Sequence, residues 1–106
     1  MKKTFGKFEA EVKNVKISKL LSRDSIAFTC KLYVNGKYVA DCGDEGNGGN
    51  MDILYVNEKN KTLFNEFIKY IESQKCEGYD FNNNLDIVVE DMINDYEYEQ
   101  IGRAHV

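Results

Sequence analysis

The chain lacks several residues on which particular chemistries depend. Its 106 residues include no Pro and no Trp, and the one His is His105, next to the last position. A Ser–His or Cys–His catalytic pair needs a base that titrates near neutral pH, and zinc hydrolases use His as a ligand. We therefore expect neither kind of centre. We predict that the protein is not an enzyme, with no catalytic residues, no metal site and no cofactor.

Cysteine is also scarce. Cys30, Cys42 and Cys76 are an odd number and form no CxxC pair, so four ligands for a structural zinc ion are missing. We expect free thiols that are buried as small hydrophobic side chains.

Long hydrophobic runs are absent, because no apolar stretch approaches the length of a membrane-spanning helix. The basic start, MKKTFGKFEAEV, is not followed by the apolar segment of a signal peptide. These two absences predict a cytoplasmic protein with no membrane contact. The length and a hydrophobic content of 42% fit a single domain with a modest core.

The last six residues, IGRAHV at 101–106, match the translation of a widely used sequencing adapter, ATCGGAAGAGCACACGTC. We therefore expect residues 1–100 to form one α+β domain and residues 101–106 to be a non-native tail. The only His then belongs to the tail, and the natural C-terminus is not fixed by this sequence.

Alternating hydrophobic residues predict strands in the first half of the chain. Residues 5–17 alternate with an irregularity that predicts a bulge near Asn14, and residues 18–24 form a connection or a single helical turn. Residues 25–34 form the clearest strand, in which one face consists of Ile26, Phe28, Cys30, Leu32 and Val34. The pair Asn35-Gly36 predicts a two-residue hairpin turn because both positions favour positive φ. Residues 37–41 return as the partner strand, and residues 51–56 form another strand.

The second half changes to helical periodicity. In residues 61–74, the positions of Phe64, Phe67, Ile68 and Ile71 form one apolar stripe, and Asn60 or Thr62 can cap the helix. After a loop at 76–84, residues 85–99 form a second helix that Asn84 caps, with Leu85, Val88, Val89, Met92 and Tyr96 inward. Strands followed by helices predict an α+β fold: a small antiparallel sheet, built from N-terminal strands and a hairpin, with two C-terminal helices packed on one face.

The segment CGDEGNGGN at 42–50 holds four of the eight glycines. It lacks the Lys-Ser/Thr of a phosphate-binding loop and the spacing of a dinucleotide fingerprint. Oxygen ligands for calcium are present at Asp41, Asp44, Asn47, Asn50 and Asp52, but not in a regular calcium-loop order. We interpret the segment as a strand-to-strand connection that can also form a contact surface, through Asp44, Glu45, Gly46, Asn47, Gly48, Gly49 and Asn50.

Charge is unevenly distributed. Residues 1–37 carry nine Lys and Arg against three Asp and Glu, whereas residues 86–99 carry six acids and no base. The two segments either attract each other within the fold, or the acidic helix docks on a basic partner. Under the second interpretation, Asp91, Asp95 and Glu97 are candidate contact residues.

The segment LYVNGKYVADCGDEGNGGNMD resembles part of a group of small proteins of unassigned function from phages and mobile elements. The matching residues are Leu32, Tyr33, Asn35-Gly36-Lys37, Gly46, Gly48-Gly49 and Asn50. The resemblance covers about a fifth of the chain and implies a source rather than an activity. From it we expect a viral or mobile-element counter-defence protein in the host cytosol. It would act as a stoichiometric, non-catalytic inhibitor of a host immune component, for example as an anti-CRISPR protein.

Three alternatives remain open. A sponge that sequesters a nucleotide immune signal would need lysines and aromatics, for which Lys13, Lys16, Lys31 and Tyr33 are candidates, and it would form an oligomer such as a homodimer. Phe5, Phe8 and Tyr33 among the N-terminal lysines could bind single-stranded nucleic acid. A small enzyme could use paired carboxylates, although no spacing singles out a pair.

Overall fold

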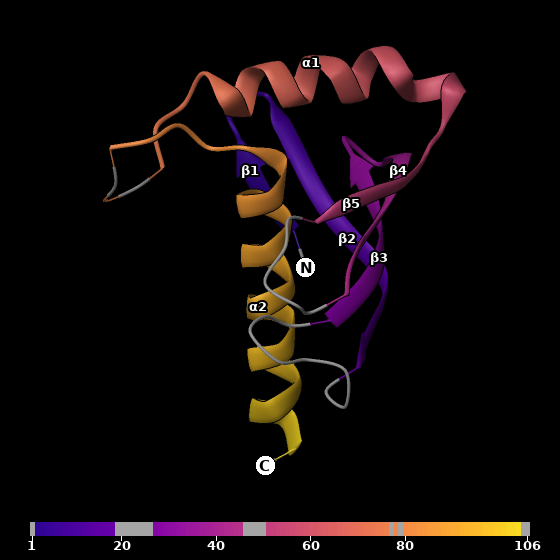
Figure 1. Cartoon of the computed structure of the whole chain (residues 1–106), viewed down its shortest axis with the longest axis vertical. Coiled ribbons are helices and arrows are strands. Elements are labelled where there is room, and N and C mark those ends of the chain that lie inside the picture. Colours follow the sequence, from indigo (N-terminus) through magenta and orange to yellow (C-terminus); the bar gives the residue numbers. More distant parts are fainter. Residues whose placement is uncertain (1, 19–26, 46–50, 77, 79, 105–106) are drawn as a thin grey trace.

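Five antiparallel strands form one sheet, in which every strand pairs with its neighbour in the sequence (Figure 1). The computed structural model describes residues 2–18, 27–45, 51–76, 78 and 80–104, with only the backbone for 100–104. The elements are β1 (Lys2–Phe5), β2 (Phe8–Ser18), β3 (Ala27–Val34), β4 (Lys37–Asp44), β5 (Asp52–Val56), the 3-10 helix η1 (Glu58–Asn60), α1 (Lys61–Glu72) and α2 (Leu85–Ala104). Strands followed by helices confirm the α+β prediction.

The N-terminal segment forms a hairpin, whereas the sequence predicts one strand over residues 5–17. β1 and β2 are joined by a turn at Gly6 and Lys7, with Phe5 paired to Phe8. Gly6 has a φ of +59°, and a Cβ at this position would collide with the ring of Tyr70. The prediction missed β1 because its Lys-Lys-Thr sequence shows no hydrophobic alternation, although the glycine before the alternating stretch was a usable signal.

Two backbone predictions in the sheet are confirmed. Asn35 and Gly36 adopt φ values of +53° and +79° and join β3 to β4. Asn14 has a φ of +52° and lies where the β2–β3 register shifts between Lys13 and Lys16, which is the expected bulge.

β4 is longer than predicted. It continues through Cys42, Gly43 and Asp44, which the sequence assigns to the glycine-rich connection. The pairs Cys30–Cys42 and Phe28–Asp44 show that the ladder with β3 continues to the end of the strand. Gly43 suggested a loop here. However, Ala40, Cys42 and Asp44 lie at alternate positions, and their side chains all face the core, as in a regular strand.

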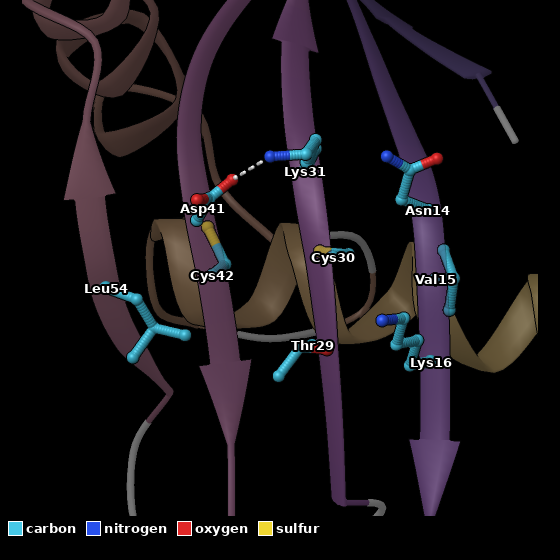
Figure 2. Close-up of a pocket in the computed structure, with 9 residues that line it drawn as sticks. All are labelled: Asn14, Val15, Lys16, Thr29, Cys30, Lys31, Asp41, Cys42 and Leu54. Atoms are coloured by element: carbon cyan, nitrogen blue, oxygen red, sulfur yellow. Dashed lines mark hydrogen bonds and ion pairs between the residues drawn. The ribbon is translucent and has the colours of Figure 1, made fainter.

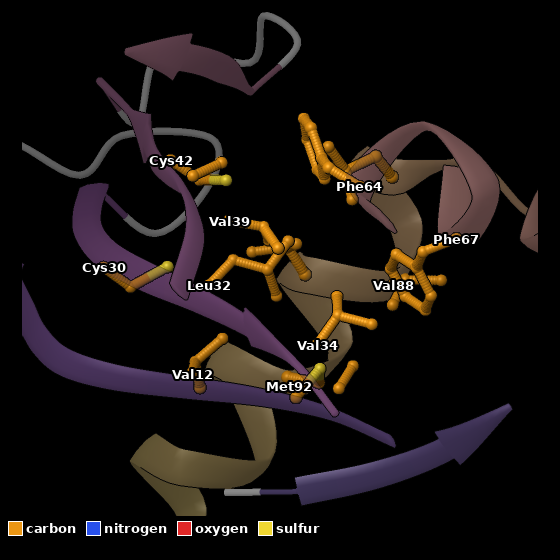
Figure 3. Close-up of a cluster of buried hydrophobic side chains, with 14 of the residues drawn as sticks. Val12, Cys30, Leu32, Val34, Val39, Cys42, Phe64, Phe67, Val88 and Met92 are labelled. Atoms are coloured by element: carbon orange, nitrogen blue, oxygen red, sulfur yellow. The ribbon is translucent and has the colours of Figure 1, made fainter. Parts of the chain in front are cut away.

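Both helices pack on the same face of the sheet, as predicted (Figures 1 and 3). From α1, Phe64, Phe67 and Ile71 are buried, and the ring of Phe67 contacts Phe5 and Phe8 at centroid distances of 5.9 and 5.8 Å. From α2, the buried residues are Leu85, Val88, Val89, Met92 and Ile93; Ile93 was not predicted, and Tyr96 is only half-buried. Cys30 and Cys42 are buried free thiols, as expected, and Cys76 is half-buried.

The two helix starts differ. The Asn84 side-chain oxygen accepts a hydrogen bond from the Ile87 N–H at 2.9 Å, which confirms the predicted cap of α2. Asn60 precedes α1 without a side-chain capping bond, because its amide donates to the Tyr38 carbonyl instead. α2 extends through Ala104, and the proposed non-native origin of residues 101–106 stays a prediction. In the part of the chain that the structure describes, no helix is both long and apolar enough to cross a membrane.

Candidate functional site

The predicted contact loop at 44–50 is corrected at its first residue. Asp44 ends β4 and is buried, with 6% of its surface exposed, so it does not belong to an exposed loop. Glu45 is exposed. Gly46, Asn47, Gly48, Gly49 and Asn50 lie outside the described residues, so a contact role for them stays a prediction.

Asp44 instead meets the acidic helix. Burial, a hydrogen bond with Asp44 and the charges of Asp44, Asp86 and Asp91 raise the pKa of Glu90 to about 7. Burial also raises the pKa of Asp86. Two adjacent carboxyl groups favour one shared proton, because two negative charges at this distance would repel each other. The pair therefore links β4 to α2. Among the described residues, no three His, Cys, Asp or Glu side chains are grouped to hold a metal ion.

The acidic surface of α2 is partly balanced by lysines. Asp91 and Asp95 are exposed and Glu97 is half-buried. The Asp95 carboxylate lies 3.2 Å from the ammonium of Lys3 on β1, so the basic N-terminal segment and the acidic helix do attract each other within the fold. Asp91 lines a hollow of about 730 Å³ together with Lys3 and Lys75. A docking role for these acids stays a prediction.

The opposite side of the sheet, here called the outer face, carries polar and aromatic side chains. No described helix covers it, and α2 lies behind the strands when this face is viewed from the front (Figure 2). Along β3, Thr29, Lys31 and Tyr33 alternate with the buried side chains, so they point outward. By strand pairing, the outer face includes Glu11, Lys13, Lys16, Thr29, Lys31, Tyr33, Tyr38, Asp41, Gly43, Asp52 and Tyr55.

Three tyrosines form a row across β3, β4 and β5. The rings of Tyr33 and Tyr38 have centroids 5.6 Å apart, and those of Tyr38 and Tyr55 lie 6.3 Å apart with an interplanar angle of 23°. Each ring therefore contacts its neighbour within the range of aromatic pairs. We call Tyr33, Tyr38 and Tyr55 the tyrosine row.

Tyr38 is the most firmly held member of the row. A register shift at Val39 separates the Tyr33–Tyr38 pair from the Leu32–Ala40 pair, which leaves the Tyr38 carbonyl outside the regular ladder. The side-chain amides of Asn57 and Asn60 donate to this carbonyl at 3.0 and 2.9 Å. The Tyr38 hydroxyl donates to the Asp41 carboxylate at 2.8 Å. Burial and the bond to Asp41 raise the pKa of Tyr38.

Lysines surround the tyrosine row. The Lys13 ammonium lies 4.5 Å from the centroid of the Tyr33 ring, and the Lys31 ammonium lies 4.8 Å from that of Tyr38. Lys31 also pairs with Asp41 at 3.3 Å, and this hydrogen bond raises the pKa of Lys31. Lys13 has a looser ion pair with Glu11 at 3.9 Å. Lys16 has no ion-pair partner among the described residues. These contacts hold cations over aromatic faces, where the ring quadrupole attracts them.

A hollow of about 510 Å³ adjoins the row and is lined by Asn14, Val15, Lys16, Thr29, Cys30, Lys31, Asp41, Cys42 and Leu54 (Figure 2). Gly43 on β4 lies between Thr29 and Leu54, and its lack of a side chain leaves room for theirs. A Cβ on this residue would lie 3.1 Å from Leu54 Cδ1 and 3.4 Å from Thr29 Cγ2. Any side chain at this position would therefore crowd Thr29 and Leu54.

β5 forms an edge of the sheet and exposes three consecutive hydrophobic side chains, here called the edge patch. Ile53, Leu54 and Tyr55 are 46%, 58% and 51% exposed. Cys42 pairs with Ile53 while Asp41 pairs with Tyr55, so Leu54 is an extra residue in the ladder. Such a bulge disfavours simple edge-to-edge pairing with another strand. The edge patch therefore fits side-chain contacts better than strand addition.

The sequence identified part of the outer face. Lys13, Lys16, Lys31 and Tyr33, named as a nucleotide pocket, do lie on one face, whereas Phe5 and Phe8 pack against α1 and cannot join them. Tyr38, Asp41 and Tyr55 were missed as a group. The available signal was the symmetric placement of Tyr33 and Tyr38 around the Asn35-Gly36 turn.

Comparisons of the chain with protein-family models, with curated proteins and with solved structures gave no match.

Proposed function

We propose that the protein is a stoichiometric, non-catalytic inhibitor that captures a component of a host defence system, for example a CRISPR effector. The counter-defence context is supported by the resemblance of residues 32–52 to phage and mobile-element proteins. The non-catalytic character is supported by the lack of His in residues 1–100. The partner is a host protein that the chain binds and blocks without chemically modifying it.

The observation that carries the proposal is the edge patch on β5. Monomeric proteins seldom expose several large apolar side chains side by side, and such groups mark protein contacts. Ile53, Leu54 and Tyr55 are each about half exposed, and Tyr55 continues into the tyrosine row. Tyrosine is also enriched among residues that dominate binding energy at interfaces. The contact surface thus shifts from the glycine-rich segment and the acidic helix to β5.

The test uses the tagged chain as bait in a lysate of a host that carries an active CRISPR system. We expect the bait to recover one effector component in equimolar amount and to block interference against a plasmid. The Ile53→Glu variant should lose both effects, because it places a charge in the edge patch outside the hollow. Tyr98→Glu is the matched control, since Tyr98 is 78% exposed on α2. Far-ultraviolet circular dichroism verifies that each variant is folded.

Two outcomes separate the alternatives. If Asp91→Lys, Asp95→Lys and Glu97→Lys together abolish capture while Ile53→Glu does not, the acidic helix is the contact and the assignment to β5 is wrong. If the effector is inactivated by far less than an equimolar amount of the protein, the inhibitor acts catalytically and the proposal fails.

A further inference from the structure

We propose that the outer face binds a nucleotide, with the base against the tyrosine row and the phosphate held by Lys13, Lys16 and Lys31. The proposal does not depend on a protein partner, but it shares Leu54 and Tyr55 with the edge patch.

The arrangement of lysines points to an anion. Lys13 on β2 and Lys31 on β3 are direct cross-strand partners on the same face. Like charges placed opposite each other destabilise a sheet. Lys16, which pairs across from Thr29, adds a third ammonium on the same face. Without a ligand, the rings of Tyr33 and Tyr38 and the carboxylates of Glu11 and Asp41 offset this repulsion. A phosphate group between the lysines would offset it more completely.

The tyrosine row supplies the surface for a planar base. Base stacking on aromatic side chains tolerates any base, because every base has a π face. The Tyr38 and Tyr55 rings are stacked with an interplanar angle of 23°, and the half-exposed ring of Tyr55 leaves a place for a base at the end of the row. The amides of Asn57 and Asn60 fix the backbone at Tyr38, which makes this part of the surface preorganised.

Asp41 determines which way round a nucleotide would bind. Its carboxylate accepts from the Tyr38 hydroxyl and from Lys31, on the β4 side of the outer face. A carboxylate repels phosphate but accepts hydrogen bonds from base N–H groups and sugar hydroxyls. The phosphate is therefore expected toward β2, near Lys13 and Lys16, and the base and sugar toward β4 and β5.

The hollow beside the tyrosine row can take part of such a ligand, although Lys13 and the three tyrosines do not line it. Its volume of about 510 Å³ falls within the range of small-molecule sites, roughly 300–1,000 Å³. Lys16, Thr29, Lys31 and Asp41 provide donors and an acceptor, and Leu54 provides an apolar wall.

Binding can be measured with the full chain by calorimetry and by its tyrosine emission, since the protein has seven Tyr and no Trp. The probes are AMP, GMP, UMP, ATP and a cyclic dinucleotide, with inorganic phosphate and a short oligo-dT strand as comparisons. We expect saturable binding of at least one nucleotide, weaker binding of phosphate, and affinity that decreases with salt. Lys13→Gln and Lys31→Gln should each weaken binding about tenfold. Lys69→Gln removes the same charge from exposed α1 and should bind as the wild type does.

Three results would overturn the proposal. The first is the absence of binding by any nucleotide at millimolar concentration. The second is binding that persists in a Lys13→Gln/Lys31→Gln double variant whose melting temperature matches the wild type. The third is binding of the oligo-dT strand alone, which would make the outer face a surface for single-stranded nucleic acid. Loss of nucleotide binding with retained capture of a host protein would leave the proposed inhibitor function intact.

Discussion

The carboxyl groups of Glu90 on α2 and Asp44 at the end of β4 interact with each other, although the two residues are 46 positions apart in the chain. Burial and the negative charges around Glu90 keep its proton in place until about pH 7. The contact that joins the sheet to the helix thus depends on a proton.

The first prediction is that stability falls as pH rises. Glu90 has a folded pKa of about 7, above its ordinary value of 4.5, so the folded state binds more protons between these two values. The free energy of unfolding then decreases with rising pH across this window, and the stabilisation is lost above pH 7. The raised pKa of Asp86 acts in the same direction. Urea unfolding at several pH values between about 5 and 8 measures the effect.

The Glu90→Gln variant separates this pair from other groups. It keeps a hydrogen-bonding side chain but cannot ionise, so its stability should vary less with pH and should exceed that of the wild type at pH 8. Glu99→Gln is the control, because Glu99 is exposed on the same helix and is not among the charges that raise the pKa of Glu90. An unchanged pH slope in Glu90→Gln would show that the Asp44–Glu90 pair is not the cause.

The second prediction concerns the turn between β1 and β2. Gly6→Ala should destabilise the protein by more than Gly36→Ala. Both residues have positive φ, which costs a side-chain-bearing residue about 1–2 kcal/mol. Only at Gly6 does the new Cβ also collide with Tyr70, whereas nothing lies within 4 Å of the corresponding position at Gly36. Denaturant unfolding gives the loss of unfolding free energy for each variant, and the difference between the two losses is the cost of the collision with Tyr70. Equal losses of unfolding free energy would contradict the Gly6–Tyr70 contact.

The third prediction concerns the core. Phe67→Ala should reduce the free energy of unfolding by about 3–5 kcal/mol, because a fully buried ring would be replaced by a cavity. The rings of Phe5 and Phe8 would lose their edge-to-face partner as well. Phe81→Ala is the matched control, since Phe81 is 50% exposed. Similar losses for the two variants would show that α1 does not dock on β1 and β2 as described.

Features that depend on a few neighbouring residues were predictable from the sequence. The Asn35-Gly36 turn, the bulge at Asn14 and the cap at Asn84 each depend on the backbone preferences of single residues. The apolar stripe of α1 follows from helical periodicity alone. These features are local, so residues far away in the chain do not change them.

Features that depend on strand register were not predictable. The extra residues at Val39 and Leu54 change which side chains face outward, and they create the row of Tyr33, Tyr38 and Tyr55. The Asp44–Glu90 contact requires the placement of α2 against β4, which no local pattern specifies. The same holds for the burial of Asp44, because an acidic residue beside glycines is typical of an exposed loop.

The neighbour-to-neighbour order of the strands has a consequence for how the chain folds. Every strand pairing joins consecutive segments, so the sheet can grow one hairpin at a time from the N-terminus. Such local pairings close short loops and favour fast folding for a protein of this strand content. During synthesis, β1 to β4 can therefore form a ladder before α1 and α2 have left the ribosome. The apolar face of this ladder stays uncovered until the helices are synthesised, and the packing of Phe67 and Met92 against it completes the core.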